Sequence, residues 1–191
     1  TAGRGVVHSE MPEQEEGVME GFQLWLNLPS YQKMCKPAYL DIPSEAIPEY
    51  SSPTGVKVRV IAGQTQGTKG AVQRPTDAFP TDALYLDIHF EKRASFQQIL
   101  PADHNAFLFV YRGAVDVGSH ELQTPVVLHT MAILRNEGEG VEICAAAGTK
   151  VLLIAGQPLN EPIAQYGPFV MNTRDELIQA VDDFRAGLYN S

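Results

Sequence analysis

The sequence lacks any cluster of basic residues, and this absence excludes one broad class of partner. Its 191 residues contain 14 Lys and Arg against 23 Asp and Glu, which gives a formal net charge of -9. Nonspecific nucleic-acid binding depends on basic side chains that displace counterions from the phosphates. We therefore expect no direct contact with nucleic acid, and any link to DNA would run through another protein.

Cysteine is scarce and long apolar runs are absent. Cys35 and Cys144 are far apart in the chain, and neither belongs to a CxxC pair. This spacing argues against a disulfide framework and favours a reducing compartment, which predicts the cytoplasm, and the nucleus as well in a eukaryote. No apolar run reaches the length of a membrane span, so we expect no membrane partner.

The common catalytic motifs are also missing. The stretch GQTQGTKG follows a strand pattern without leading into a helix, so it predicts a β-turn or loop rather than a phosphate-binding loop. No nucleophile elbow supports a serine triad, and neither cysteine has a partner histidine for nucleophilic catalysis.

Alternation of apolar and polar residues dominates the sequence that is present. The residues Phe22–Leu28, Val56–Val60 and Leu84–Phe90 alternate with period two, which predicts strands with one buried face. Turn residues separate further short apolar stretches, as expected for an antiparallel sandwich or barrel. These stretches are Phe107–Val110, Ala114–Val117, Met131–Leu134, Val141–Cys144 and Val151–Ala155. The fold class predicted is all-β.

One helix is predicted near the end of the sequence. Thr173 and Glu176 form a T-x-x-E capping box, and Gly187 is a suitable stop. The apolar residues that follow the box fall on one helical face, at Leu177, Ile178, Val181, Phe184 and Leu188. A shorter helical turn is predicted within Pro29–Lys36.

The proline distribution divides the chain unevenly. Pro43, Pro48 and Pro53 predict a linker or crossover rather than a strand. We expect residues 1–42 to form the C-terminal part of a first barrel, residues 43–55 the linker, and residues 56–191 a complete barrel with the terminal helix. The leading piece is too small for a barrel of its own and would leave strand edges exposed.

His8 and Glu10 are the candidate metal ligands. Residues two apart in a strand point to the same face, so the imidazole and the carboxylate could converge on one ion. Such a pair suits iron, manganese, nickel or copper better than a structural zinc site. The pattern is short, however, and leaves open an exposed histidine beside the acidic stretch EQEEG.

The remaining histidines lack ligand spacing. His104 precedes a strand, but Ala106 stands where a second histidine would be expected, and we interpret His104 and Asn105 as hydrogen-bonding residues of a turn or barrel mouth. We interpret His89, His120 and His129 as structural or solvent-exposed.

Several stretches together resemble the pirin family of bicupins. The matching pieces occur in the family's order and span nearly the whole chain: TAGRGVVHSEMP, GFQLWLNLP, VRVIAGQTQGTKG, LPADHNAFLFVYRG, LLIAGQPLNEPI and YGPFVMNT. The resemblance implies two cupin (jelly-roll) barrels joined by a linker, with a C-terminal helix. Here it covers the complete second barrel and the remaining part of the first.

The resemblance also implies an iron site of three histidines and one glutamate. His8 and Glu10 match the third histidine and the glutamate, while the family's H-x-H pair has no counterpart and would lie upstream of Thr1. Other divalent metals such as Mn, Ni, Cu or Zn fit the same ligands. Two ligands are too few to compete with water, so we expect this chain alone to bind iron weakly or not at all and to be inactive.

Two activities follow from the resemblance. One is a quercetin 2,3-dioxygenase-type reaction, in which Glu10 would be the general base towards a flavonol-like substrate. The other is a non-enzymatic, redox-responsive iron cofactor that binds transcription factors or metabolic enzymes. A bicupin that only binds a small molecule is a third class. We expect a monomer unless another chain supplies the missing strands.

Overall fold

The computed structural model describes residues 1–11, 14–72, 81–119 and 122–189. Contacts group the chain into two compact units, one formed by Thr1–Leu40 with Leu159–Ser191 and the other by Asp41–Pro158. We call these the terminal unit and the barrel unit and describe each by itself. This grouping does not test the predicted domain boundaries at residues 42 and 55, which stay a prediction.

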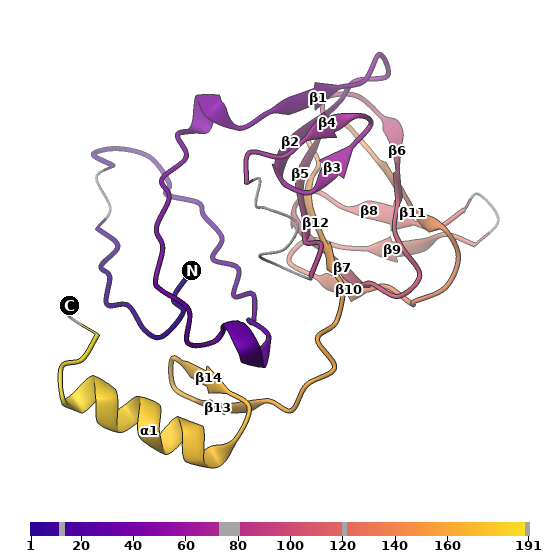
Figure 1. Ribbon diagram of the computed structural model, residues 1–191. Helices are drawn as coiled ribbons and strands as arrows, with labels where there is room; N and C mark the ends of the chain where they lie inside the picture. The colour runs from indigo at the N-terminus through magenta and orange to yellow at the C-terminus, as the bar shows by residue number, and fades with distance from the viewer. Residues whose placement is uncertain (12–13, 73–80, 120–121, 190–191) are drawn as a thin grey trace. The chain divides into compact units, whose positions relative to one another are not determined.

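Among the described residues, two antiparallel sheets of four or more strands form the body of the barrel unit (Figure 1). The six-stranded sheet has the order β1 (Glu49–Ser51), β2 (Val56–Ala62), β5 (Leu84–Phe90), β12 (Lys150–Gly156), β7 (Asn105–Arg112) and β10 (Met131–Ile133). The four-stranded sheet has the order β6 (Ala94–Ile99), β11 (Gly140–Ala145), β8 (Val115–Val117) and β9 (Thr124–Val126). The jelly-roll prediction is confirmed.

One continuous apolar core lies between these sheets. Alternate residues of each strand are buried, as the pattern of β5 illustrates, where Leu86 and Ile88 are fully buried and Asp87 and His89 are only partly so. Burying a large aliphatic side chain contributes about 1.5–3 kcal/mol. The core combines strands from both sheets and includes Val58, Val60, Leu108, Val110, Ile143, Val151 and Leu153.

The predicted turn at GQTQGTKG is a tight hairpin. It joins β3 (Gln64–Thr65) to β4 (Thr68–Lys69), and both central residues have positive φ, 45° at Gln66 and 79° at Gly67. This is the backbone of the two-residue turns whose twist matches that of β-strands. The prediction of a β-turn instead of a phosphate loop is therefore confirmed.

The terminal unit contains little regular structure. It has the short 3-10 helix η1 (Ser30–Gln32), the hairpin β13 (Ala164–Tyr166) and β14 (Phe169–Met171), and the helix α1 (Arg174–Arg185). The capping box is confirmed, since Thr173 Oγ1 accepts from the Glu176 N–H and the Glu176 carboxylate accepts from the Thr173 N–H. Gly187, at φ 75°, follows the helix end as predicted.

The strand predicted over Phe22–Leu28 is wrong. These residues have no regular secondary structure, and no strand in the described parts of the chain pairs with them. Trp25 and Leu26 are 59% and 52% exposed. Alternation records which side chains would share a face, but a strand also needs a hydrogen-bonded neighbour, and none is provided here.

Two differences concern strands that the sequence did not predict. Glu49–Ser51, within the proline-rich stretch, forms β1, which pairs with β2 at the sheet edge. Pro48 lies just before it, a position where a missing N–H costs no ladder bond. The strand β6 has Phe96 as its only buried residue, so its alternation is weak in the sequence.

A second short 3-10 helix, η2 (Ser44–Ala46), precedes β1. No helix in the described ranges combines the length and the apolar composition that crossing a membrane requires.

Candidate functional site

The structure places both predicted metal ligands on an exposed, irregular segment. His8 and Glu10 are solvent-exposed and belong to no strand. Gln23 Nε2 donates a hydrogen bond of 3.1 Å to Glu10 Oε1. This amide is a neighbour that the sequence did not identify, and it holds one oxygen of the carboxylate towards the residues 22–28.

These ligands do not complete a metal site within the described residues. No group of three or more His, Cys, Asp and Glu side chains that could hold an ion occurs in that part of the chain. An imidazole and a carboxylate are suitable donors for iron, but two exposed donors leave most coordination positions to water. The residues present therefore fit only part of the implied site.

The other histidines have separate surroundings. His104 is 8% exposed, and its backbone N–H donates to the Pro101 carbonyl in the turn before β7. Asn105, the first residue of β7, accepts a hydrogen bond from the side-chain amide of Asn136, as predicted for a hydrogen-bonding residue. His129 has a positive φ of 58°. His120 lies outside the described residues.

His89 belongs to a polar cluster that the sequence analysis missed. Tyr111 Oη donates to Asp87 Oδ1 at 2.6 Å, and His89 Nε2 lies 3.0 Å from Asp87 Oδ2 and 3.1 Å from Tyr111 Oη. The D-x-H spacing within β5 was a usable signal, because it places both side chains on one face. Tyr111 comes from β7 and is brought there only by the strand order β5-β12-β7.

Burial and hydrogen bonding act in opposite directions on Asp87. Desolvation raises the pKa of its carboxyl group, but the hydrogen bonds from His89 and Tyr111 and the charges of His89 and Arg59 outweigh it. The pKa of Asp87 therefore lies below its ordinary value, and the group is a carboxylate at neutral pH.

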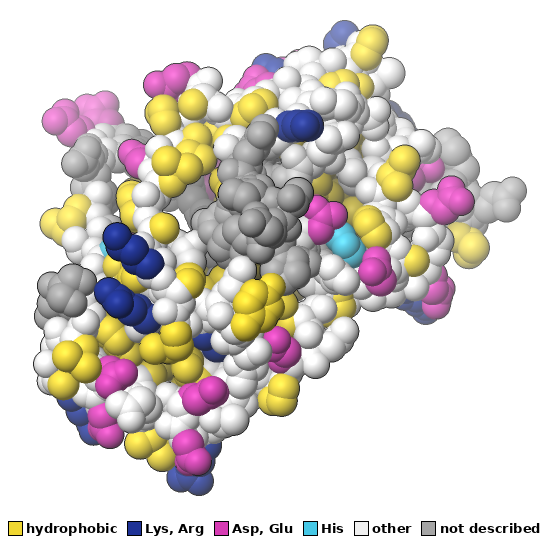
Figure 2. Space-filling view, viewed as in Figure 1, with side chains coloured by type: hydrophobic (Ala, Val, Ile, Leu, Met, Phe, Trp, Pro, Cys, Tyr) yellow, Lys and Arg dark blue, Asp and Glu magenta, His cyan; other side chains and the backbone are white. Residues whose placement is uncertain are grey.

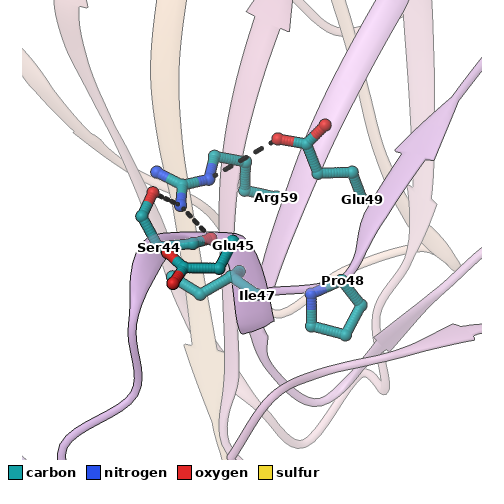
Figure 3. Close-up of a pocket in the computed structure, with 6 residues that line it drawn as sticks. All are labelled: Ser44, Glu45, Ile47, Pro48, Glu49 and Arg59. Atoms are coloured by element: carbon teal, nitrogen blue, oxygen red, sulfur yellow. Dashed lines mark hydrogen bonds and ion pairs between the residues drawn. The ribbon is translucent and has the colours of Figure 1, made fainter.

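A pocket of about 600 Å³ lies beside Arg59 (Figure 3). The Arg59 guanidinium donates to the carbonyl and hydroxyl oxygens of Ser44 and forms an ion pair with Glu49. Figure 3 shows this head group turned towards both partners. The pocket contains none of the predicted site residues, and its cation is already paired. Its lining consists of Ser44, Glu45, Ile47, Pro48, Glu49 and Arg59.

A buried lysine organises the terminal unit. Lys33 is 5% exposed, and its Nζ donates to Asn27 Oδ1 at 2.7 Å and to the Val170 carbonyl at 3.2 Å. Desolvation lowers the pKa of Lys33, although the charges of Glu161 and Glu176 partly oppose this effect. The ammonium group thus links residues before η1 to β14.

The two glutamates are held by hydrogen-bond donors. Glu161 accepts from the Ser30 N–H, the Ser30 hydroxyl and the Asn172 amide. Desolvation raises the pKa of Glu161, but these bonds and the Lys33 charge bring it below its ordinary value. Backbone hydrogen bonds from Thr173 and Asn172 are the main cause of the lowered pKa of Glu176.

Sequence comparisons identify related proteins over almost the whole chain. A family described as "Pirin C-terminal cupin domain" matches residues 85–190. A Pseudomonas aeruginosa protein, provisionally named a quercetin 2,3-dioxygenase, is 44% identical over 194 residues, which cover 98% of this chain and 65% of the relative. Human pirin is 42% identical over 97% of this chain and 62% of its own length. This chain thus spans less than two thirds of these relatives.

Structural comparison gives the same relationship. The crystal structure of quercetin 2,3-dioxygenase from Acinetobacter baumannii superposes with a TM-score of 0.77 at 37% sequence identity. The match covers 87% of this chain and 56% of that enzyme. The likeness therefore includes most of this chain, while a large part of the enzyme has no counterpart in these 191 residues.

Proposed function

Because the chain belongs to the pirin family, we propose that His8 and Glu10 are two ligands of a catalytic metal ion, with iron as the first choice and Mn, Ni, Cu or Zn as alternatives. The similarity to the A. baumannii quercetin 2,3-dioxygenase is the observation that carries the proposal. The reaction class is the oxygen-dependent cleavage of a flavonol-like substrate. A bound metal with open positions would supply Lewis acidity towards an enol oxygen.

Glu10 is the residue proposed to move the proton. A carboxylate can act as general base when it lies within hydrogen-bond reach of the substrate hydroxyl. Glu10 is exposed, and one of its oxygens accepts from Gln23. Gln23 is then a positioning residue, because its amide fixes one oxygen and leaves the other for the substrate proton.

The proposal requires metal donors in addition to His8 and Glu10. Since His8 and Glu10 are exposed and no third ligand joins them in the described ranges, this pair by itself should hold metal weakly. The relatives named above are longer than this chain, so their unmatched residues could include such donors. We propose that the further donors are an H-x-H pair in the part of a full-length protein that this chain does not cover.

Two measurements test this proposal. Metal analysis of the purified 191-residue chain should give the same metal content with and without the His8→Ala and Glu10→Ala substitutions, whereas in a full-length protein carrying the H-x-H pair these substitutions should remove about one ion. Oxygen uptake with quercetin should then fall by about 10²–10⁴-fold in a full-length Glu10→Gln variant, the usual contribution of a general base. Glu16→Gln, an exposed carboxylate of the same segment, is the matched control. An unchanged rate in Glu10→Gln would contradict metal-centred catalysis by this residue.

Exposed apolar side chains favour protein binding as a second candidate function. In Figure 2, hydrophobic side chains gather at the surface over α1, β13 and β14. Residues 1–40 expose many more, which is unusual for a segment that needs no partner. These are Val6, Val7, Met11, Val18, Met19, Phe22, Leu24, Trp25, Leu26, Tyr31, Met34, Tyr39 and Leu40. Quercetin-independent binding to a transcription factor or metabolic enzyme, with no oxygen uptake, would favour this candidate.

A further inference from the structure

The cluster of Asp87, His89 and Tyr111 lies on the outer face of the six-stranded sheet. Asp87 and His89 alternate with Leu86 and Ile88, which face the core and are fully buried. Tyr111 is the extra residue of a β-bulge between β7 and β12. A bulge redirects a side chain, and here the phenol reaches over β12 to the two residues of β5.

The donor atoms of this cluster have the mutual spacing of metal ligands. Tyr111 Oη lies 2.6 Å from Asp87 Oδ1 and 3.1 Å from His89 Nε2, and His89 Nε2 lies 3.0 Å from the other carboxylate oxygen, Asp87 Oδ2. Ligand atoms about 2.1 Å from one ion and at right angles to each other lie about 3 Å apart. An ion could therefore take the place of the shared protons with little movement of the side chains.

We propose that Asp87, His89 and Tyr111 form a binding site for a first-row transition-metal ion, distinct from the site that contains His8 and Glu10. An imidazole together with two anionic oxygens favours iron or copper over magnesium or calcium, which take oxygen ligands alone. The cluster contains one histidine and one carboxylate, which are two ligands. The Tyr111 phenol supplies the third.

Solvent access leaves room for further ligands. The side chains of His89 and Asp87 are 23% and 16% exposed, so water can complete the coordination from the open side. Three protein donors with open positions are typical of sites that bind exogenous ligands.

Binding of an ion involves one proton, because the Tyr111 hydroxyl releases its proton to solvent when its oxygen bonds to the ion. Tyr85 shares the outer face of β5 and supplies a matched phenol for comparison with Tyr111.

The surrounding cations oppose binding only in part. On β2, Lys57 is paired with Glu91 and Arg59 with Glu49, which reduces their effect. Lys150 lies next to His89 in the register of β12 and adds a positive charge at that end. A Lys150→Gln variant should therefore bind the ion more tightly than the wild type.

The experiment uses the 191-residue chain with His8→Ala and Glu10→Ala substitutions, so that the first site cannot contribute. Fe³⁺ supplied as its nitrilotriacetate complex should bind at one equivalent and give a visible phenolate-to-iron absorption band. Tyr111→Phe should abolish the band and weaken binding by about tenfold or more, and Asp87→Asn should weaken it similarly. Tyr85→Phe, which removes a phenol from the same face, should leave the band unchanged.

Several outcomes would overturn this proposal. They are the absence of stoichiometric binding in the parent chain, a band that persists in Tyr111→Phe, or a band lost in Tyr85→Phe. Circular dichroism of each variant establishes that it is folded. The proposal requires that the parent chain itself binds iron. A parent chain that binds none therefore overturns the proposal, even if a variant does not fold. The parent chain lacks His8 and Glu10, so iron binding by it does not test the first metal site. Failure of one proposal therefore leaves the other intact.

Discussion

The barrel unit and the terminal unit are stabilised in different ways. In the barrel unit, alternate residues of two sheets form one apolar core, and Leu86, Leu108 and Leu153 have no exposed surface. In the terminal unit, the buried residues include Lys33. Hydrogen bonds from Ser30 and Asn172 to the Glu161 carboxylate join the segments of this unit. The first unit depends on apolar burial and the second on a polar network.

The stability of each unit therefore depends on different conditions. Apolar burial is insensitive to pH and is lost mainly when core volume is removed. A polar network of carboxylates and amides depends on protonation, and each broken bond leaves a partner without its hydrogen bond. The two units should therefore respond to different perturbations.

The largest expected effect is a cavity in the barrel core. Leu108→Ala should lower the free energy of unfolding of the barrel unit by about 2–5 kcal/mol, because Leu108 is fully buried and the lost contacts are not replaced. Ile133→Ala, at an 81% exposed position of β10, is the control and should have little effect. Urea denaturation followed by circular dichroism measures both. Equal effects of the two substitutions would contradict an apolar core as the main source of stability.

An intermediate effect should come from acid, and it should reach the terminal unit first. The pKa values of Glu161 and Glu176 are lowered in the folded chain, so each contributes stability above its ordinary pKa that is lost as the pH falls through the folded pKa. Two-dimensional NMR during an acid titration should show the amide signals of Ser30 changing before those of Leu153 in β12.

A variant sharpens this prediction. Glu161→Gln removes the charge that accepts from Ser30 and Asn172, so it should make the terminal unit less stable at neutral pH and less dependent on pH. Glu15→Gln, an exposed residue of the same unit, should keep the wild-type titration. Simultaneous loss of Ser30 and Leu153 signals would show that the units do not differ in this way.

The sequence predicted the barrel unit well because its pattern is local. Alternation along Val56–Val60 and Leu84–Phe90 needs only knowledge of which face is buried, and both strands are present with the expected faces. The same rule failed at Phe22–Leu28, where the pattern is equally clear but no neighbouring strand exists among the described residues. Alternation describes a potential strand, and the partner decides whether it forms.

The candidate sites show the same limit. The sequence identified His8 and Glu10 from their spacing, but it could not show Gln23, which approaches Glu10 through the course of the chain. Likewise D-x-H in β5 was visible, whereas Tyr111 depends on the strand order and on a bulge. Contacts made within a few residues were predictable, and contacts made by topology were not.

The smallest expected effect concerns the cap of α1. Thr173→Ala should lower the free energy of unfolding of the terminal unit by about 1 kcal/mol, because the Glu176 N–H loses its acceptor. Thr173→Ser keeps the hydroxyl and should restore most of this stability. Amide hydrogen exchange of the first helical turn measures the change, which should not extend to the strands of the barrel unit. If Thr173→Ser were as unstable as Thr173→Ala, the methyl group of Thr173 rather than its hydrogen bond would stabilise the helix, and the terminal unit would depend on apolar burial at this position as the barrel does.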